Sequence, residues 1–123
     1  MGGIIPSCSR GFATWEVGSC PLGVSPYGAM DMAGNVMEWG ADWYSGGYYE
    51  KAPPKNPKGP KVGKLRVLRG GAWFNSKVLL RSAFRTGFSP GGSNHGIGFR
   101  CAKTASSEFV EAPARRTRMA RRP

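Results

Sequence analysis

The chain has 123 residues, with 19 glycines, 10 prolines and a formal net charge of +11 at pH 7. This length fits one domain with a modest core, and the glycine and proline content favours loops over long helices. No apolar run reaches membrane-spanning length, and no export signal is visible at the start of the chain.

Two blocks carry most of the positive charge. Residues 51–69 contain seven basic residues and no acid, and residues 115–123 contain five arginines. Such blocks can attract nucleic acid or anionic lipid. The alternative is a solvated loop and a disordered basic tail over residues 104–123. The first block lacks the interleaved aromatic residues of a protein that binds single-stranded nucleic acid.

Taken in order along the chain, the residue patterns predict short strands separated by long loops. After a ragged edge at residues 1–12, weak alternation over 13–20 predicts an edge strand. Residues 36–43 predict a second strand, although Trp39 and Trp43 are four apart and leave a short helix as an alternative. Trp39, Trp43 and Tyr44 are expected in the core or as its lid.

The C-terminal half has the strongest strand signal. Residues 65–73 are rich in apolar and aromatic side chains and include a glycine pair, which is typical of a bulge or a close backbone approach. Residues 45–64 read as a linker-like insertion and residues 86–96 as a loop. Residues 97–102 predict the last strand. The main domain is therefore expected to span residues 13–103.

A turn rich in oxygen ligands lies between the first two predicted strands. Asp31, Asn35 and Glu38 follow one another at intervals of four and three around Gly34. Hard oxygen ligands in such a turn suit calcium, although the spacing is not that of the helix–loop–helix calcium motif. The alternative is structural: Asp31 caps the backbone, and Glu38 pairs with an arginine.

Arginines at three other positions need partners. Arg81 and Arg85 are four apart, and Arg100 lies inside an apolar stretch. Because burying an unpaired charge is costly, carboxylate or carbonyl partners are expected, with Glu38 and Asp42 as candidates.

The histidine and the cysteines give weaker signals. His95 is the single histidine, so a zinc pattern or a two-histidine iron site within the chain is excluded. It is conceivable as a general base, but a loop residue without special role is the default. Cys8, Cys20 and Cys101 are compatible with one disulfide and a free thiol, or with three reduced thiols.

Four blocks, YGAMDMAGNVMEWGADWY, RVLRGGAW, LRSAFR and GIGFRCA, resemble in order and spacing the C-terminal half of the formylglycine-generating enzyme (sulfatase-modifying factor) family. The resemblance covers residues 15–103. It implies an α+β, C-type-lectin-like domain that is loop-rich, with short strands and little helix. Family members are usually about twice this length.

The resemblance also implies a calcium site. Its ligands would be the side chains of Asp31 and Glu38 and the carbonyls of Gly34 and Val36. Calcium is therefore the expected cofactor. A second calcium site of the family lies in a segment that has no counterpart in this sequence.

The family's copper chemistry is not expected. Family enzymes use copper held by two cysteines, together with oxygen, to oxidise a sulfatase cysteine to formylglycine. The first of these cysteines matches Asn75, and no cysteine lies between Gly71 and Ile97. Cuprous copper prefers thiolates. Cys101 resembles a family cysteine whose disulfide partner belongs to the absent half.

Three further functions stay open beside a copper-free accessory or binding module. One is an oxidase whose missing ligands come from another segment or chain. Another is polyanion binding through the basic blocks. The third is a ligand-binding surface, because some family members are diversified by retroelements between the RGG and GFR motifs. The residues that would form this surface, for a protein or peptide ligand, are Phe74, Asn75, Ser76, Phe84, Thr86, Phe88, Ser93 and His95.

Overall fold

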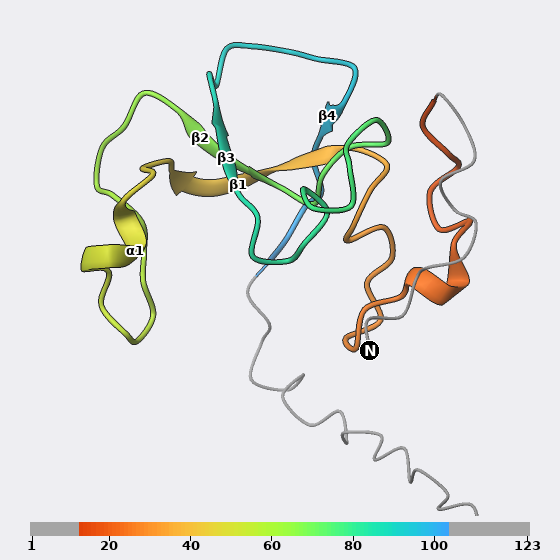
Figure 1. Cartoon of the computed structure of the whole chain (residues 1–123), viewed down its shortest axis with the longest axis horizontal. Helices are drawn as coiled ribbons and strands as arrows, with labels where there is room; N and C mark the ends of the chain where they lie inside the picture. Colours follow the sequence, from red (N-terminus) through yellow and green to blue (C-terminus); the bar gives the residue numbers. More distant parts are fainter. Residues whose placement is uncertain (1–12, 104–123) are drawn as a thin grey trace, which may run out of the picture.

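The computed structural model describes residues 13–103, and the predictions for residues 1–12 and 104–123 lie outside them. Two short helical turns and four strands are connected by long loops (Figure 1). In chain order the elements are η1 (Pro21–Gly23), β1 (Met37–Trp43), α1 (Tyr48–Lys51), β2 (Arg66–Arg69), β3 (Thr86–Phe88) and β4 (Ile97–Gly98). None of the described helices has the length and apolarity needed to cross a membrane.

The four strands form one sheet in the order β3-β2-β1-β4. β1 is antiparallel to β2, with Trp39 opposite Leu68, and β2 is antiparallel to β3. β4 is parallel to β1 and pairs over two residues. Since β3 and β4 are the two edges, residues 89–96 cross from one edge of the sheet to the other (Figure 1).

The core is small and centred on β2. Val67, Leu68 and Ala72 are the buried hydrophobic residues among those described, and Leu68 is 1% exposed. Trp39 packs against Phe88 of β3, with ring centroids 6.1 Å apart. Trp39, Trp43 and Tyr44, which were expected in the core or as its lid, are half-buried and do not belong to the buried core. Because β1 is extended, the alternative of a short helix is wrong.

The glycine pair ends β2 earlier than predicted. Gly70 and Gly71 have φ angles of +90° and +70°, a region that other residues rarely adopt. A Cβ on Gly71 would also lie 2.5 Å from the Leu80 side chain. The strand expected over residues 65–73 is therefore limited to Arg66–Arg69, and the chain turns sharply into the segment that follows.

Other element predictions are corrected by the structure. Residues 13–20 form no strand, and the last strand covers two of the six residues expected for it. Thr86–Phe88, predicted as loop, is β3. Gly87 weakens any local strand signal there, and pairing with β2 supplies the strand geometry. The predicted linker at 45–64 contains α1.

Candidate functional site

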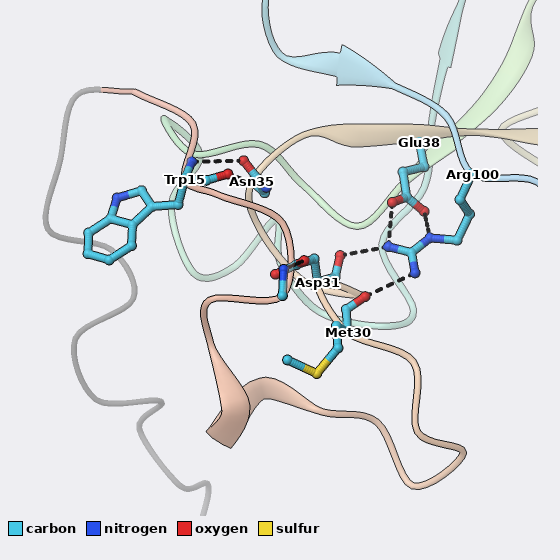
Figure 2. A network of polar contacts seen from close by, with 7 residues as sticks. Trp15, Met30, Asp31, Asn35, Glu38 and Arg100 are labelled. Carbon is cyan, nitrogen blue, oxygen red and sulfur yellow. Dashed lines mark hydrogen bonds and ion pairs between the residues drawn. The ribbon is translucent and has the colours of Figure 1, made fainter.

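The Asp31 turn, residues 31–38, connects the N-terminal segment to the sheet. Asp31 and Asn35 have φ angles of +53° and +62°, which Asp and Asn adopt more readily than most residues. Asn35 accepts a hydrogen bond from the Trp15 N–H (3.2 Å) and donates one to the Trp15 carbonyl (3.1 Å; Figure 2). Asp31 Oδ2 accepts from the Gly18 N–H at 2.7 Å. Both side chains thus anchor residues 15–18.

Arg100 joins this turn to the chain after β4. Its Nε and Nη2 donate to the two carboxylate oxygens of Glu38, each at 2.5 Å (Figure 2). Nη1 donates to the Met30 carbonyl (2.9 Å) and Nη2 to the Asp31 carbonyl (3.1 Å). The hydrogen bonds that Arg100 donates to Glu38 raise the pKa of Arg100, and burial opposes this rise. The prediction that Glu38 pairs with an arginine is confirmed.

The donor set of the turn has the chemistry that calcium prefers. Carboxylates at Asp31 and Glu38 and nearby carbonyls are hard oxygen ligands. Arg100 donates one hydrogen bond to each Glu38 oxygen. Because a carboxylate has about four lone-pair sites, Glu38 keeps lone pairs that could bind a metal ion. Within residues 13–103 no group of three or more His, Cys, Asp or Glu side chains gathers. A calcium ion here would therefore need carbonyl ligands.

Three rings gather in a second region, where the loop after β2 meets the approach to β4. We call Trp73, Phe74 and His95 the aromatic loop cluster. Phe74 lies 5.1 Å from Trp73 and 5.4 Å from His95 between ring centroids, and Trp73 lies 6.0 Å from His95. Phe74 is 49% exposed. A Cβ on Gly96 would collide with the Phe74 ring, so the absence of a side chain at Gly96 leaves room for the ring.

The structure divides the eight residues of the predicted ligand-binding surface. The exposed ones are Phe74, Ser76, Ser93 and His95, and the half-buried ones are Asn75, Phe84, Thr86 and Phe88. Asn75 accepts a hydrogen bond from the Ala72 N–H at 2.8 Å and so shapes the loop. Thr86 and Phe88 belong to β3. Trp73, which the sequence analysis did not select, lies beside Phe74. Its large aromatic side chain close to the glycine pair was the feature of the sequence that could have pointed to it.

The basic block at 51–69 has two kinds of cation. Arg66 lies 3.7 Å from the Trp43 ring centroid and donates to the Ala41 carbonyl. Arg69 donates to the Tyr49 hydroxyl at 2.9 Å. Both arginines therefore have structural contacts, whereas the lysines of the block are exposed: Lys51, Lys55, Lys58, Lys61 and Lys64.

The remaining arginines and cysteines take simple positions. Arg81 donates to the Val78 carbonyl in its own turn at 3.1 Å. Arg85 donates to the carbonyls of Ser45 and Gly46, so its predicted carbonyl partners exist. Cys101 is a free, exposed thiol and Cys20 is disulfide-bonded. Cys8 lies outside the described residues.

Sequence comparisons identify related proteins. The model of the "Sulfatase-modifying factor enzyme 1-like domain" matches residues 9–105. The serine/threonine-protein kinase Pkn1 of Chlamydia pneumoniae is 52% identical over 81 residues, which are 64% of this chain and 13% of that protein. The formylglycine-generating enzyme of Streptomyces coelicolor is 42% identical over 82 residues, covering 64% of this chain and 26% of that enzyme.

Solved structures of similar fold agree with the sequence comparisons. Treponema denticola variable protein 1 superposes with a TM-score of 0.58 and 34% identity, covering 72% of this chain and 31% of that one. PvdO from Pseudomonas aeruginosa gives a TM-score of 0.63 and 29% identity, covering 75% and 34%. The chain thus spans about a third or less of these proteins. It belongs to the family of sulfatase-modifying factor enzyme 1-like domains and has their loop-rich, C-type-lectin-like fold.

Proposed function

We propose that this chain is a binding or accessory module that uses the family scaffold without the copper chemistry. The observation that carries the proposal is the aromatic loop cluster. Phe74 is 49% exposed and packs against His95, on loops held at both ends by the sheet. Exposed rings on loops fixed by a rigid frame are typical of protein-binding surfaces.

The cysteine positions support a role without copper. The sequence contains no cysteine between Gly71 and Ile97. Asn75, which matches the first copper ligand of the family, uses its side-chain oxygen to hold the Ala72 N–H. A neutral amide is a poor substitute for the thiolate that cuprous copper prefers. An oxidase completed by another segment is the competing proposal, and the similarity to formylglycine-generating enzymes favours it.

The relatives support binding in two ways. In Pkn1, a protein named as a kinase, the similar segment makes up 13% of the length, as expected for one module among others. The Treponema denticola neighbour is named a variable protein. By analogy, the loops between Gly71 and Gly98 form a variable face for a protein or peptide ligand. A near-identical repeat of this segment close to the gene would support diversification by a retroelement.

A calcium ion would stabilise the frame behind these loops. The proposed ligands are the side chains of Asp31 and Glu38 and the carbonyls of Gly34 and Val36. Bound there, calcium would supply a positive charge that holds the Asp31 turn in place. The exchange of hydrogen bonds between this turn and residues 15–18 supports a need for rigidity at this point.

Exposed apolar side chains suggest a further partner. Val17, Leu22 and Tyr27 are 81%, 74% and 97% exposed, and all lie in the N-terminal part of the described chain. Large apolar residues gathered in one exposed region are typical of a surface that another polypeptide covers. The proposed occupant is the remaining part of the domain, since this chain covers 31% and 34% of the two similar structures.

Selection from a random peptide library on the folded chain tests the binding role. Peptides that bind the unmodified chain should bind Phe74→Ala about tenfold more weakly, because an exposed aromatic residue at the centre of an interface often dominates affinity. Val62→Ala is the control, since it truncates an apolar side chain that is 82% exposed on a different loop. Equal binding by both variants, or stronger loss with Val62→Ala, would contradict the proposal.

A further inference from the structure

A pocket of about 190 Å³ lies away from the aromatic loop cluster, between the sheet, α1 and the loop at 52–64. Figure 1 shows α1 and this loop beyond one end of the sheet, with the N-terminal segment beyond the other. We call this cavity the tyrosine pocket. Its lining includes Asp42, Tyr48, Tyr49, Gly59, Arg69 and Arg85.

The outer wall of the tyrosine pocket is fixed by specific contacts. The Tyr48 hydroxyl accepts a hydrogen bond from the Gly59 N–H at 3.0 Å, which ties the loop to α1. Gly59 has a φ of +73°, and a Cβ there would lie 2.9 Å from Asp42 Cβ. Only glycine fits this close approach without strain. The pocket is therefore formed before any ligand arrives.

Two guanidinium groups meet around Tyr49 inside this frame. Arg85 Cζ lies 4.3 Å from the Tyr49 ring centroid and 5.0 Å from that of Tyr44, so two rings fix its plane. Arg69 Nη2 donates to the Tyr49 hydroxyl at 2.9 Å, and its Nη1 donates to the Ser82 carbonyl at 2.8 Å. Tyr49 thus positions both arginines.

Neither arginine has an anionic partner among residues 13–103. Arg85 donates from Nη2 to the carbonyls of Ser45 (2.7 Å) and Gly46 (3.2 Å), which are neutral acceptors. Across residues 13–103 the ion pair found is that of Arg100 with Glu38, so Asp42 lines the pocket without pairing with either arginine. The Nε groups of Arg69 and Arg85 and Nη1 of Arg85 have no acceptor among the described residues.

We propose that the tyrosine pocket binds a carboxylate group of a peptide, either an acidic side chain or a free C-terminus. A planar guanidinium with open N–H groups matches a carboxylate through paired, charge-assisted hydrogen bonds. The volume of about 190 Å³ is below the roughly 300 Å³ at which pockets for drug-sized ligands begin. It therefore fits one side chain or chain end.

The charge of the lining favours a single negative charge. Arg69 and Arg85 contribute two positive charges and Asp42 one negative charge, which leaves a net charge of +1 (2 − 1). A carboxylate monoanion balances this charge, whereas a phosphate dianion would exceed it by one unit and meet stronger repulsion from Asp42. This site does not depend on the aromatic loop cluster, so the two can be tested separately.

The test is an NMR titration of the ¹⁵N-labelled 123-residue chain with three short peptides. Acetyl-Gly-Glu-Gly-amide carries a side-chain carboxylate, acetyl-Gly-Gln-Gly with a free C-terminus carries a terminal one, and acetyl-Gly-Gln-Gly-amide carries none. At least one of the first two should shift the Nε–H signals of Arg69 and Arg85 in a saturable way, and the amide should not. The peptide that binds identifies the source of the carboxylate.

Variants locate the effect. Arg85→Lys keeps the charge but loses the planar fork, and should weaken binding of the better peptide about tenfold. Tyr49→Phe, which removes only the hydroxyl that holds Arg69, should weaken it by a smaller factor. Arg81→Gln removes a positive charge from an arginine that contacts its own turn, and should leave Kd unchanged. Amide spectra of each variant report whether it is folded.

Three results would overturn the proposal. One is the absence of saturable shifts with either carboxylate peptide. Another is weakening by Arg81→Gln together with unchanged binding by Arg85→Lys, which would show attraction by overall charge alone. The third is tighter binding of inorganic phosphate than of both carboxylate peptides in the same titration, which would assign the pocket to a different anion.

Discussion

Two arginines at opposite ends of the sheet contrast in what holds them. Arg100, next to the Asp31 turn, donates two hydrogen bonds to Glu38 and two to backbone carbonyls. Arg85, in the tyrosine pocket, lies against two tyrosine rings and donates to two carbonyls. Within the part of the chain that the structure describes, Arg100 is paired with a carboxylate and Arg85 is not. An arginine fixed in place without a counter-ion is available to a ligand, whereas a paired one serves the fold.

The contrast extends to what each end connects. Through Glu38, Met30 and Asp31, Arg100 joins segments that are 62 to 70 residues apart in sequence. Around the pocket, Arg85 joins β3 to the chain that leads into α1, and its N–H groups remain partly open. The Asp31 turn is therefore expected to govern stability, and the pocket to govern recognition.

The largest expected effect is at Arg100. Arg100→Ala leaves the Glu38 carboxylate without its partner and should lower the free energy of unfolding by about 2 kcal/mol, a value for charged hydrogen bonds at a partly exposed site. Arg85→Ala should cost about 1 kcal/mol, because its acceptors are neutral and carbonyl groups can turn to water. Urea unfolding of both variants measures the difference. Equal losses would remove the distinction between the two ends.

Calcium should sharpen the comparison with a smaller effect. At ten times its Kd, calcium should raise the free energy of unfolding of the unmodified chain by about 1.4 kcal/mol, which is measured as a rise in Tm. Asp31→Ala and Glu38→Ala should each abolish the rise. Asp42→Ala, which removes an exposed carboxylate at the pocket end, should keep it. Thermal melts with calcium and with a chelator measure this, and no rise in the unmodified chain would refute the calcium site.

The smallest effect concerns the exposed lysines. Lys55→Ala and Lys61→Ala change side chains with open surroundings, and each should alter the free energy of unfolding by less than about 0.5 kcal/mol. Neither change should affect binding of the carboxylate peptides.

The same variants test polyanion binding by the basic block. If the block binds polyanions, its affinity for a DNA duplex should fall steeply as salt is raised, and should also be lower in these variants. Duplex binding that ignores salt would exclude that role.

Sequence reasoning succeeded where local patterns carry the information. The apolar and aromatic content of residues 36–43 predicted β1. The need of Arg100 for a carboxylate partner predicted Glu38 as one of two candidates. The four motif blocks predicted the family and its loop-rich fold. These features depend on residues that are close in sequence or on blocks that recur in fixed order.

What the sequence did not reveal depends on distant segments meeting. β3 exists because Thr86–Phe88 pairs with β2, although Gly87 is a poor strand residue. The aromatic loop cluster joins Phe74 to His95 across 21 positions. The tyrosine pocket requires a four-residue helix and a loop rich in proline and lysine to fold over β2, and no periodic pattern marks that arrangement.

The measurement that tests the central claim most directly is a mass spectrum of a Cys-x-Pro-x-Arg peptide after incubation with the folded chain, copper and oxygen. Circular dichroism of the same sample establishes that the chain is folded. The account predicts that the peptide cysteine stays unconverted, because no cysteine lies between Gly71 and Ile97 to hold copper as the family enzymes do. Formation of formylglycine would contradict it and establish the chain as an oxidase.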